Sequence, residues 1–131
     1  MDKTQQPGIR IETIILANST FNRKPVVPET IPVNIEFDVK NTIISQDQKL
    51  ITEMKATLNK PDDPVYGEFL FVGIFSCSDC KNMSLEQFAE NHAPAIIVPY
   101  IREEIHSRTM KAGLPHIMIN PINIQALLKK K

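Results

Sequence analysis

The chain has 131 residues, of which 42% are hydrophobic and 23% are charged, a composition that fits one globular domain and excludes general disorder and collagen-like repeats. Fifteen Lys and Arg balance fifteen Asp and Glu, so no net charge attracts nucleic acid or an acidic membrane surface. Residues 1–10 are polar and no apolar run approaches the ~18 residues that cross a bilayer, so we expect a soluble cytoplasmic protein without a signal peptide or membrane insertion.

Four segments alternate apolar and polar residues with the period of two that is typical of strands. They predict strands over residues 9–18, 33–40, 50–58 and 65–77. A crossover containing Pro25, Pro28 and Pro32 separates the first two, because proline lacks an amide donor and holds its neighbours extended.

The fourth predicted strand is apolar on both faces. One face carries Phe69, Phe71 and Phe75, and the other carries Leu70, Val72 and Ile74. Two interpretations remain open: a central strand under helices, or a subunit interface, since exposed apolar patches mark association.

Helical spacing follows the fourth strand. Ser84 and Gln87 form a capping box and predict a helix from Ser84 to about Asn91. A stripe of isoleucines predicts a longer amphipathic helix that ends at Gly113, with Pro99 as a kink or as part of the first turn.

The chain order predicts an α+β fold. Asn123 caps a last short helix in this interpretation. Four strands followed by helices indicate a four-stranded antiparallel sheet with a long kinked helix and a short C-terminal helix on one side. We expect a flexible N-terminus over residues 1–8, one domain over 9–128 and a flexible basic tail over 129–131.

Groups that carry catalysis or bind metals do not form a recognisable arrangement. Cys77 and Cys80 make a C-x-x-C motif, but a thioredoxin-like pair needs a βαβ unit, and zinc needs two more ligands, for which His92 is the only candidate nearby. With four glycines, no phosphate-binding loop can be written. We therefore expect no enzyme, no cofactor and two ordinary thiols, with a thiol-redox or zinc protein as the alternative from another class.

Apolar residues outside the regular elements indicate a binding surface. The crossover region contributes Phe21, Val26, Val27 and Ile31, and the last helix contributes Ile124, Leu127 and Leu128. These residues either frame a groove for an extended chain or simply cap the core.

Three blocks of the second half of the chain resemble the SecB protein-export chaperones in order and spacing. They are Gly73-Ile74-Phe75-Ser76, then Pro99-Tyr100-Ile101-Arg102-Glu103 with Ile105, Ser107 and Gly113, then Pro115, Pro121, Asn123, Ala126 and Leu127. The resemblance implies the fold described above, a homotetramer built as a dimer of dimers, and ATP-independent holding of unfolded preproteins for the SecA motor.

The resemblance also implies site residues. Client-binding positions are Phe21, Val27, Ile31, Ile124, Leu127 and Leu128, and oligomer contacts are Val72, Ile74, Phe75, Tyr100 and Ile101. Glu12 and Glu68 match SecA-binding carboxylates, whereas Leu16 stands where another acidic residue is expected and the chain ends in three lysines. These departures leave open a second role in the same family, as the dedicated chaperone of an antitoxin in a toxin–antitoxin system.

Overall fold

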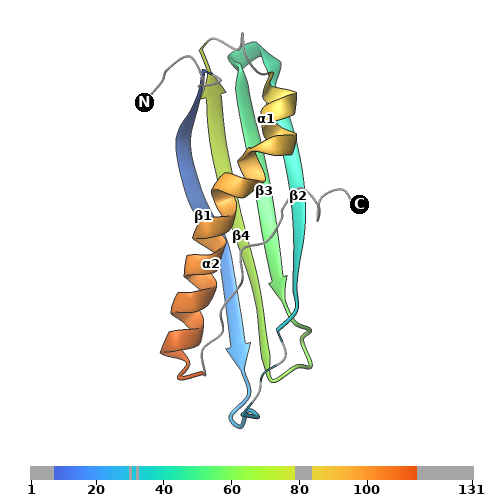
Figure 1. Cartoon of the computed structure of the whole chain (residues 1–131), viewed down its shortest axis with the longest axis vertical. Coiled ribbons are helices and arrows are strands. Elements are labelled where there is room, and N and C mark those ends of the chain that lie inside the picture. Colours follow the sequence, from blue (N-terminus) through green and yellow to red (C-terminus); the bar gives the residue numbers. More distant parts are fainter. Residues whose placement is uncertain (1–7, 30, 32, 79–83, 115–131) are drawn as a thin grey trace.

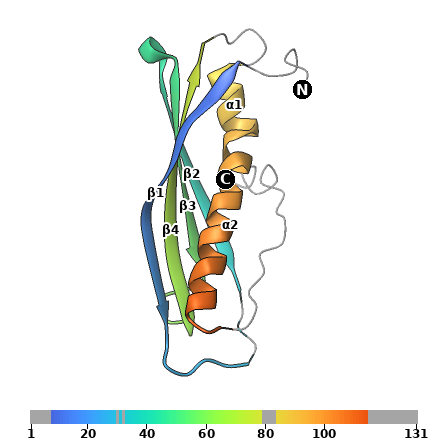
Figure 2. The same ribbon diagram turned by 90° about the vertical axis from the view of Figure 1, so that its left-hand side faces the viewer.

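The computed structural model describes residues 8–29, 31, 33–78 and 84–114. The elements follow in the order β1 (Ile9–Arg23), β2 (Ile35–Ile44), η2 (Ser45–Asp47), β3 (Lys49–Leu58), β4 (Val65–Cys77), α1 (Leu85–Asn91) and α2 (Ala93–Lys111). Both helices lie on the same side of one antiparallel sheet, as Figures 1 and 2 show, and the predicted α+β layer is therefore confirmed. The predicted last helix and tails, Gly8 aside, lie outside the described residues.

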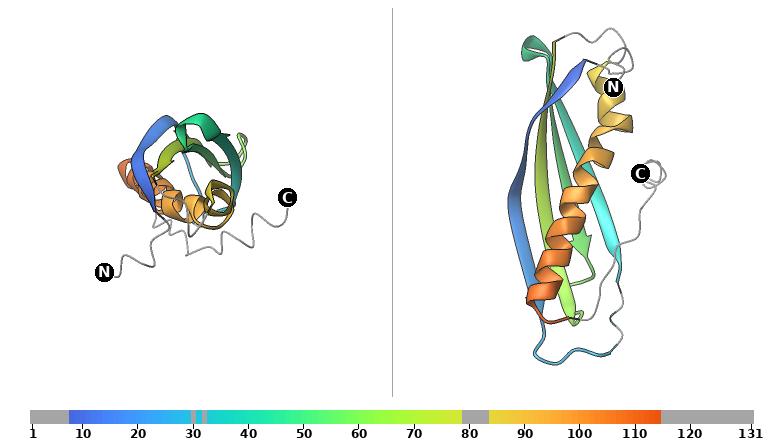
Figure 3. Two further views of the ribbon diagram at one scale, coloured as in Figure 1. Left: turned by 90° about the horizontal axis from the view of Figure 1, so that it is seen from above. Right: turned by 60° about the vertical axis from the view of Figure 1, so that its left-hand side comes forward.

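The strand order in the sheet is β1-β4-β3-β2. β4 and β3 are central, and the crossover carries the chain from one edge strand, β1, to the other, β2. Seen along the long axis, the sheet curves and the helices close its concave side (Figure 3). The sheet thus has one face under the helices and one face that no described element covers.

β1 is longer than predicted, because it continues past Asn18 to Arg23, which pairs with Val65. Its register shifts between Ile11 and Thr13 and again between Leu16 and Asn18. Each bulge reverses the side-chain alternation, so a strict period of two does not hold along this strand. β2 also differs from its prediction, since it begins at Ile35 and ends at Ile44.

The two faces of β4 have different neighbours. Phe69 and Phe75 are fully buried under the helices, while Val72 and Ile74 are half-buried on the uncovered face. β4 is therefore a central strand whose phenylalanine face builds the core, and its second apolar face stays outside the protomer's own packing.

The core consists of two clusters. Under α2, fully buried Ile97, Ile101 and Ile105 pack with Met54 and Phe69. Under α1, Phe88 meets Phe75 edge to face, with ring centroids 5.1 Å apart. We call these the α2 core and the α1 core.

Local signals explain the helix boundaries. The Ser84 hydroxyl accepts a hydrogen bond from the Gln87 amide, and the Gln87 side chain accepts one from the Ser84 amide, which confirms the predicted capping box. α2 begins at Ala93 with Pro94 in its first turn, where the missing amide hydrogen costs nothing. Pro99 lies inside α2 on its exposed side.

Gly67 is required by the ring of Phe69. A Cβ atom at Gly67 would lie 2.8 Å from two ring carbons of Phe69, which is fully buried and cannot move away. We expect Gly67→Ala to lower the free energy of unfolding by about 1–3 kcal/mol, the usual cost of overpacking. Urea unfolding measures this, with Thr57→Ala on the uncovered face as a control that changes little. An unchanged midpoint for Gly67→Ala would contradict the packing described here.

Candidate functional site

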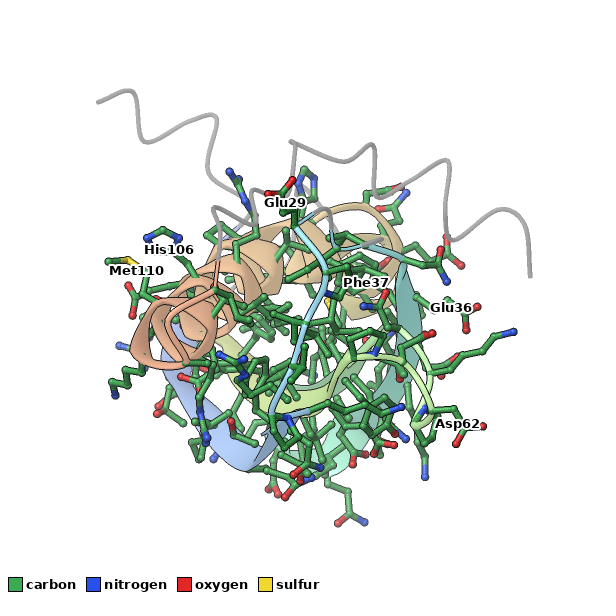
Figure 4. The ribbon with its side chains drawn as sticks, turned by 90° about the horizontal axis from the view of Figure 1, so that it is seen from below. Glu29, Glu36, Phe37, Asp62, His106 and Met110 are labelled. Atoms are coloured by element: carbon green, nitrogen blue, oxygen red, sulfur yellow. The ribbon has the colours of Figure 1, made fainter. Side chains whose placement is uncertain are left out.

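Partly buried apolar side chains from both edges of the sheet pack against the α2 core. They come from β1, the crossover, β2 and the residues that follow α2, and we call them the apolar margin: Ile14, Phe21, Val27, Ile31, Ile35, Phe37, Val39 and Leu114. Three of the predicted client-binding residues, Phe21, Val27 and Ile31, pack against this core. In Figure 4 Phe37 points inward from β2, while Glu36 points outward. Ile124, Leu127 and Leu128 lie outside the described residues.

Phe21 belongs to β1 and not to the crossover. It pairs with Gly67 on β4, on the face that the helices cover. The sequence prediction ended β1 too early because the polar residues Asn18, Ser19 and Thr20 indicated a strand end, whereas β1 continues past a bulge at Leu16–Asn18. Ile35, Phe37 and Val39 were not predicted as margin residues, although their alternation with charged residues marks one face of β2.

Hydrogen bonds hold the crossover at both ends. At its start the Lys24 amide donates to Pro64 O at 2.8 Å, and the Arg23 guanidinium donates to Ala112 O at 2.7 Å. At its end the Asn59 amide donates to Asn34 O at 2.8 Å, and the Asn34 amide donates to Asn59 Oδ1 at 2.7 Å. Val27 and Ile31 are thus positioned between two fixed points, whereas Val26 is 84% exposed.

A polar contact joins β1 to the second half of α2. The Ser19 hydroxyl donates to the Glu104 carboxylate at 2.7 Å, and Arg108 Nε donates to the same carboxylate at 3.0 Å. Burial raises the pKa of Glu104, but the two hydrogen bonds and the charges of Arg108 and Lys111 together outweigh it and hold the pKa below the ordinary value of 4.5. The ionised carboxylate therefore stabilises the folded chain.

This contact predicts a pH dependence. A carboxyl group whose pKa is lowered on folding contributes stability above its unfolded pKa, and that contribution is lost as the pH falls through the folded pKa. We expect the urea midpoint of the wild type to fall more between about pH 5 and pH 3 than that of Glu104→Gln. Parallel curves for the two proteins would show that Glu104 carries no such contribution.

The two predicted SecA-binding carboxylates lie on the uncovered face but far apart. Glu12 accepts a hydrogen bond from the Ser76 hydroxyl, which lowers the pKa of Glu12. Glu68 accepts one from the Tyr66 hydroxyl, which lowers its pKa, and it also meets Lys55 Nζ at 3.4 Å. Ser76 and Glu68 are eight residues apart on β4, or about 26 Å.

On β4, apolar residues lie between these carboxylates, and Glu53 of β3 is opposite Val72. The uncovered face carries Leu70, Val72 and Ile74 on β4, flanked by Ile15 on β1 and Ile51 on β3. Leu16, expected beside the acidic residues, instead pairs with Phe71 on the helix-covered face. The shift of β1 by its bulges places it there, so Leu16 neither adds to nor interrupts an acidic surface.

The predicted oligomer residues divide into two groups. Phe75 and Ile101 are fully buried inside the protomer and offer no side-chain surface to a partner, because both belong to its own core. Val72 and Ile74 are half-buried on the uncovered face, and Tyr100 is 47% exposed on α2. An exposed apolar stretch on the edge strand β1 was not predicted. Its exposed fractions are 50% for Ile11, 46% for Ile15 and 41% for Leu16.

Cys77 ends β4 and is buried against the α1 core. It is disulfide-bonded, and Cys80 is the only other cysteine of the sequence. The expectation of an ordinary thiol is therefore wrong for Cys77. Within the described part of the chain, no three His, Cys, Asp or Glu residues form a group that could hold a metal ion. None of the described helices is both long and apolar enough to cross a membrane.

Comparisons with known proteins agree with this architecture. The model of the family "Preprotein translocase subunit SecB" matches residues 2–131. An uncharacterized protein of Methanocaldococcus jannaschii is 30% identical over 98% of this chain and 87% of its own length. The protein-export protein SecB of Legionella pneumophila is 25% identical over 96% of this chain and 80% of its own length.

A solved structure has the same fold. It is the SecB-like chaperone Rv1957 of Mycobacterium tuberculosis in complex with a peptide from the HigA1 antitoxin, and its TM-score is 0.72 at 19% identity. The match covers 87% of this chain and 90% of the other.

Proposed function

Because the chain belongs to the SecB family of preprotein translocase subunits, we propose that it is an ATP-independent chaperone that binds unfolded polypeptides along the apolar margin. In this proposal it works in the cytoplasm, has no enzymatic activity and needs no cofactor.

The apolar margin carries the proposal. Its side chains pack against the α2 core on one side and remain partly exposed on the other, so they offer apolar surface in fixed positions. Unfolded chains expose apolar side chains, and removing both surfaces from water favours binding. Hydrogen bonds at both ends of the crossover support the proposal, because a fixed surface loses little conformational entropy when a client binds.

The test is suppression of aggregation. Stoichiometric amounts of the purified chain should slow the aggregation of a chemically denatured protein diluted into buffer, without added ATP. A chain that leaves the aggregation rate unchanged at a fourfold excess would contradict the proposal.

Two kinds of client fit the family: preproteins destined for SecA, and an antitoxin. The uncovered face favours the second as an alternative role, because its two matching carboxylates stand about 26 Å apart with apolar residues of β4 between them. The related fold of a SecB-like chaperone solved with an antitoxin peptide is compatible with it. Binding to SecA that weakens on Glu68→Arg and with added salt would support export. No binding to SecA would leave the antitoxin role.

We also propose that the chain assembles as a homotetramer through surfaces that include the exposed β1 edge and Tyr100. The expected mass by light scattering is about 59 kDa, four times the chain mass of 14.8 kDa. Leu16→Lys should reduce this mass because it places a charge among the exposed apolar residues of β1. Val26→Lys, in the crossover, is the matched control and should retain the wild-type mass. A tetramer that tolerates Leu16→Lys would exclude this edge as a contact.

A further inference from the structure

One polar pair interrupts the helix-facing side of the two neighbouring strands β2 and β3. Asn41 and Thr52 are directly opposed in the register, and every other residue on that side of the two strands is apolar. The apolar ones are Ile35, Phe37, Val39 and Ile43 on β2, and Leu50, Met54, Ala56 and Leu58 on β3. Two apolar residues would fill these positions without any need for a hydrogen bond, so the pair calls for a reason.

The pair has a defined orientation. Thr52 is fully buried, and its hydroxyl donates to Asn41 Oδ1 at 2.7 Å. This bond fixes the plane of the Asn41 amide and leaves the two Nδ2 hydrogens pointing away from Thr52. Among the described residues, Nδ2 of Asn41 has no hydrogen-bond acceptor.

Asn41 is exposed although it lies on the helix-facing side of β2, so neither helix covers it. On one side of it along β2 lie Ile35, Phe37 and Val39 of the apolar margin. On the other side lies Ile43, which lines an open cavity of 220 Å³ between η2 and the start of α1. Ile35 and Ile43 are eight residues apart, about 26 Å, so an extended segment of about eight residues spans this distance.

We propose that Asn41 recognises the main chain of a bound polypeptide: its oriented Nδ2 donates to a carbonyl oxygen of a client segment that lies extended along β2. The proposal rests on the proposed chaperone function and names a further recognition residue for it. Every peptide bond offers such an acceptor, so the contact is independent of client sequence. The contact also favours clients with a particular spacing of apolar residues. A client that places a carbonyl over Asn41 can contact Phe37 and Val39 with apolar side chains on one side and Ile43 on the other.

The other interpretation is that Asn41 only serves as the acceptor for the buried Thr52 hydroxyl. The double variant Asn41→Val/Thr52→Val separates the two, because it removes both partners and leaves no buried hydroxyl unsatisfied. If Asn41 is only structural, the double variant should bind clients as well as the wild type or better, since its surface is more apolar. If Asn41 recognises the client, the loss of one hydrogen bond should weaken binding about fivefold.

The experiment uses the full chain and a nine-residue fluorescent peptide with apolar residues at both ends and a polar centre, titrated by fluorescence anisotropy. Thr42→Val, on the opposite face of the same strand, is the matched control and should bind like the wild type. A second measurement follows the side-chain amide signal of Asn41 by NMR. This signal should shift when the peptide is added. Unchanged or tighter binding by the double variant, or an unmoved Asn41 signal, would overturn the proposal.

The failure of the chaperone function itself gives a different result. In that case the wild type would neither bind the peptide nor slow aggregation, and both proposals would fall. Aggregation suppressed equally by wild type and double variant, with equal peptide affinity, would remove only the role of Asn41.

Discussion

Phe75→Glu is expected to leave the chain unfolded. Phe75 is fully buried between the sheet and α1, where its ring meets Phe88 edge to face. Loss of a buried phenylalanine costs about 3–5 kcal/mol, and the carboxylate adds the cost of a buried charge without a partner. Since domains of this size are stable by only about 5–15 kcal/mol, we expect the cooperative urea transition to disappear and the far-ultraviolet circular dichroism to be that of an unfolded chain.

Ile74→Glu is the matched control for this prediction. Ile74 precedes Phe75 on β4, and its side chain lies half-buried on the uncovered face. The new carboxylate remains in water there, so the fold should persist. If Phe75→Glu folded and Ile74→Glu did not, the assignment of the two faces of β4 would be reversed.

Phe37→Ser is expected to reduce client affinity at least tenfold. Phe37 is part of the apolar margin and points inward from β2 (Figure 4). Burying a phenylalanine side chain is worth about 1.5–3 kcal/mol, and each 1.4 kcal/mol changes affinity tenfold. Titration of an unfolded protein by anisotropy, together with the aggregation assay, measures the loss.

Two control variants test whether the loss of affinity comes from the missing apolar side chain at position 37. Asp38→Ser changes the neighbouring residue on the uncovered face and should keep wild-type affinity. Phe37→Leu keeps an apolar side chain and should recover most of the binding. Equal affinity for Phe37→Ser and the wild type, at an unchanged urea midpoint, would show that clients bind elsewhere.

The sequence predicted β3, β4 and the start of α1 well because local signals agreed there. β4 was predicted over its observed length, and the capping box of Ser84 and Gln87 marked the helix start. At these places alternation, turn residues and caps all point to the same boundary.

The prediction was least accurate for β1, for a physical reason. The bulges at Glu12 and Ala17 are decided by pairing with β4, which lies more than forty residues later, and no local pattern reveals them. The same shift moved Leu16 away from the face of Glu12 and Glu68. Five of the eight residues of the apolar margin were not predicted as client-binding positions. Among them are Ile35, Phe37 and Val39, which the alternation identified only as the inward face of a strand.

The long-range pairing of β1 has a further consequence for how the chain folds. β2, β3 and β4 follow one another as hairpins, so they can associate through short loops, whereas β1 must wait for β4 to be made. Until β1 arrives, the outer backbone of β4 is an unpaired edge beside a row of phenylalanines, which is a template for wrong association. The nascent chain therefore passes through a state that resembles the clients it is proposed to hold.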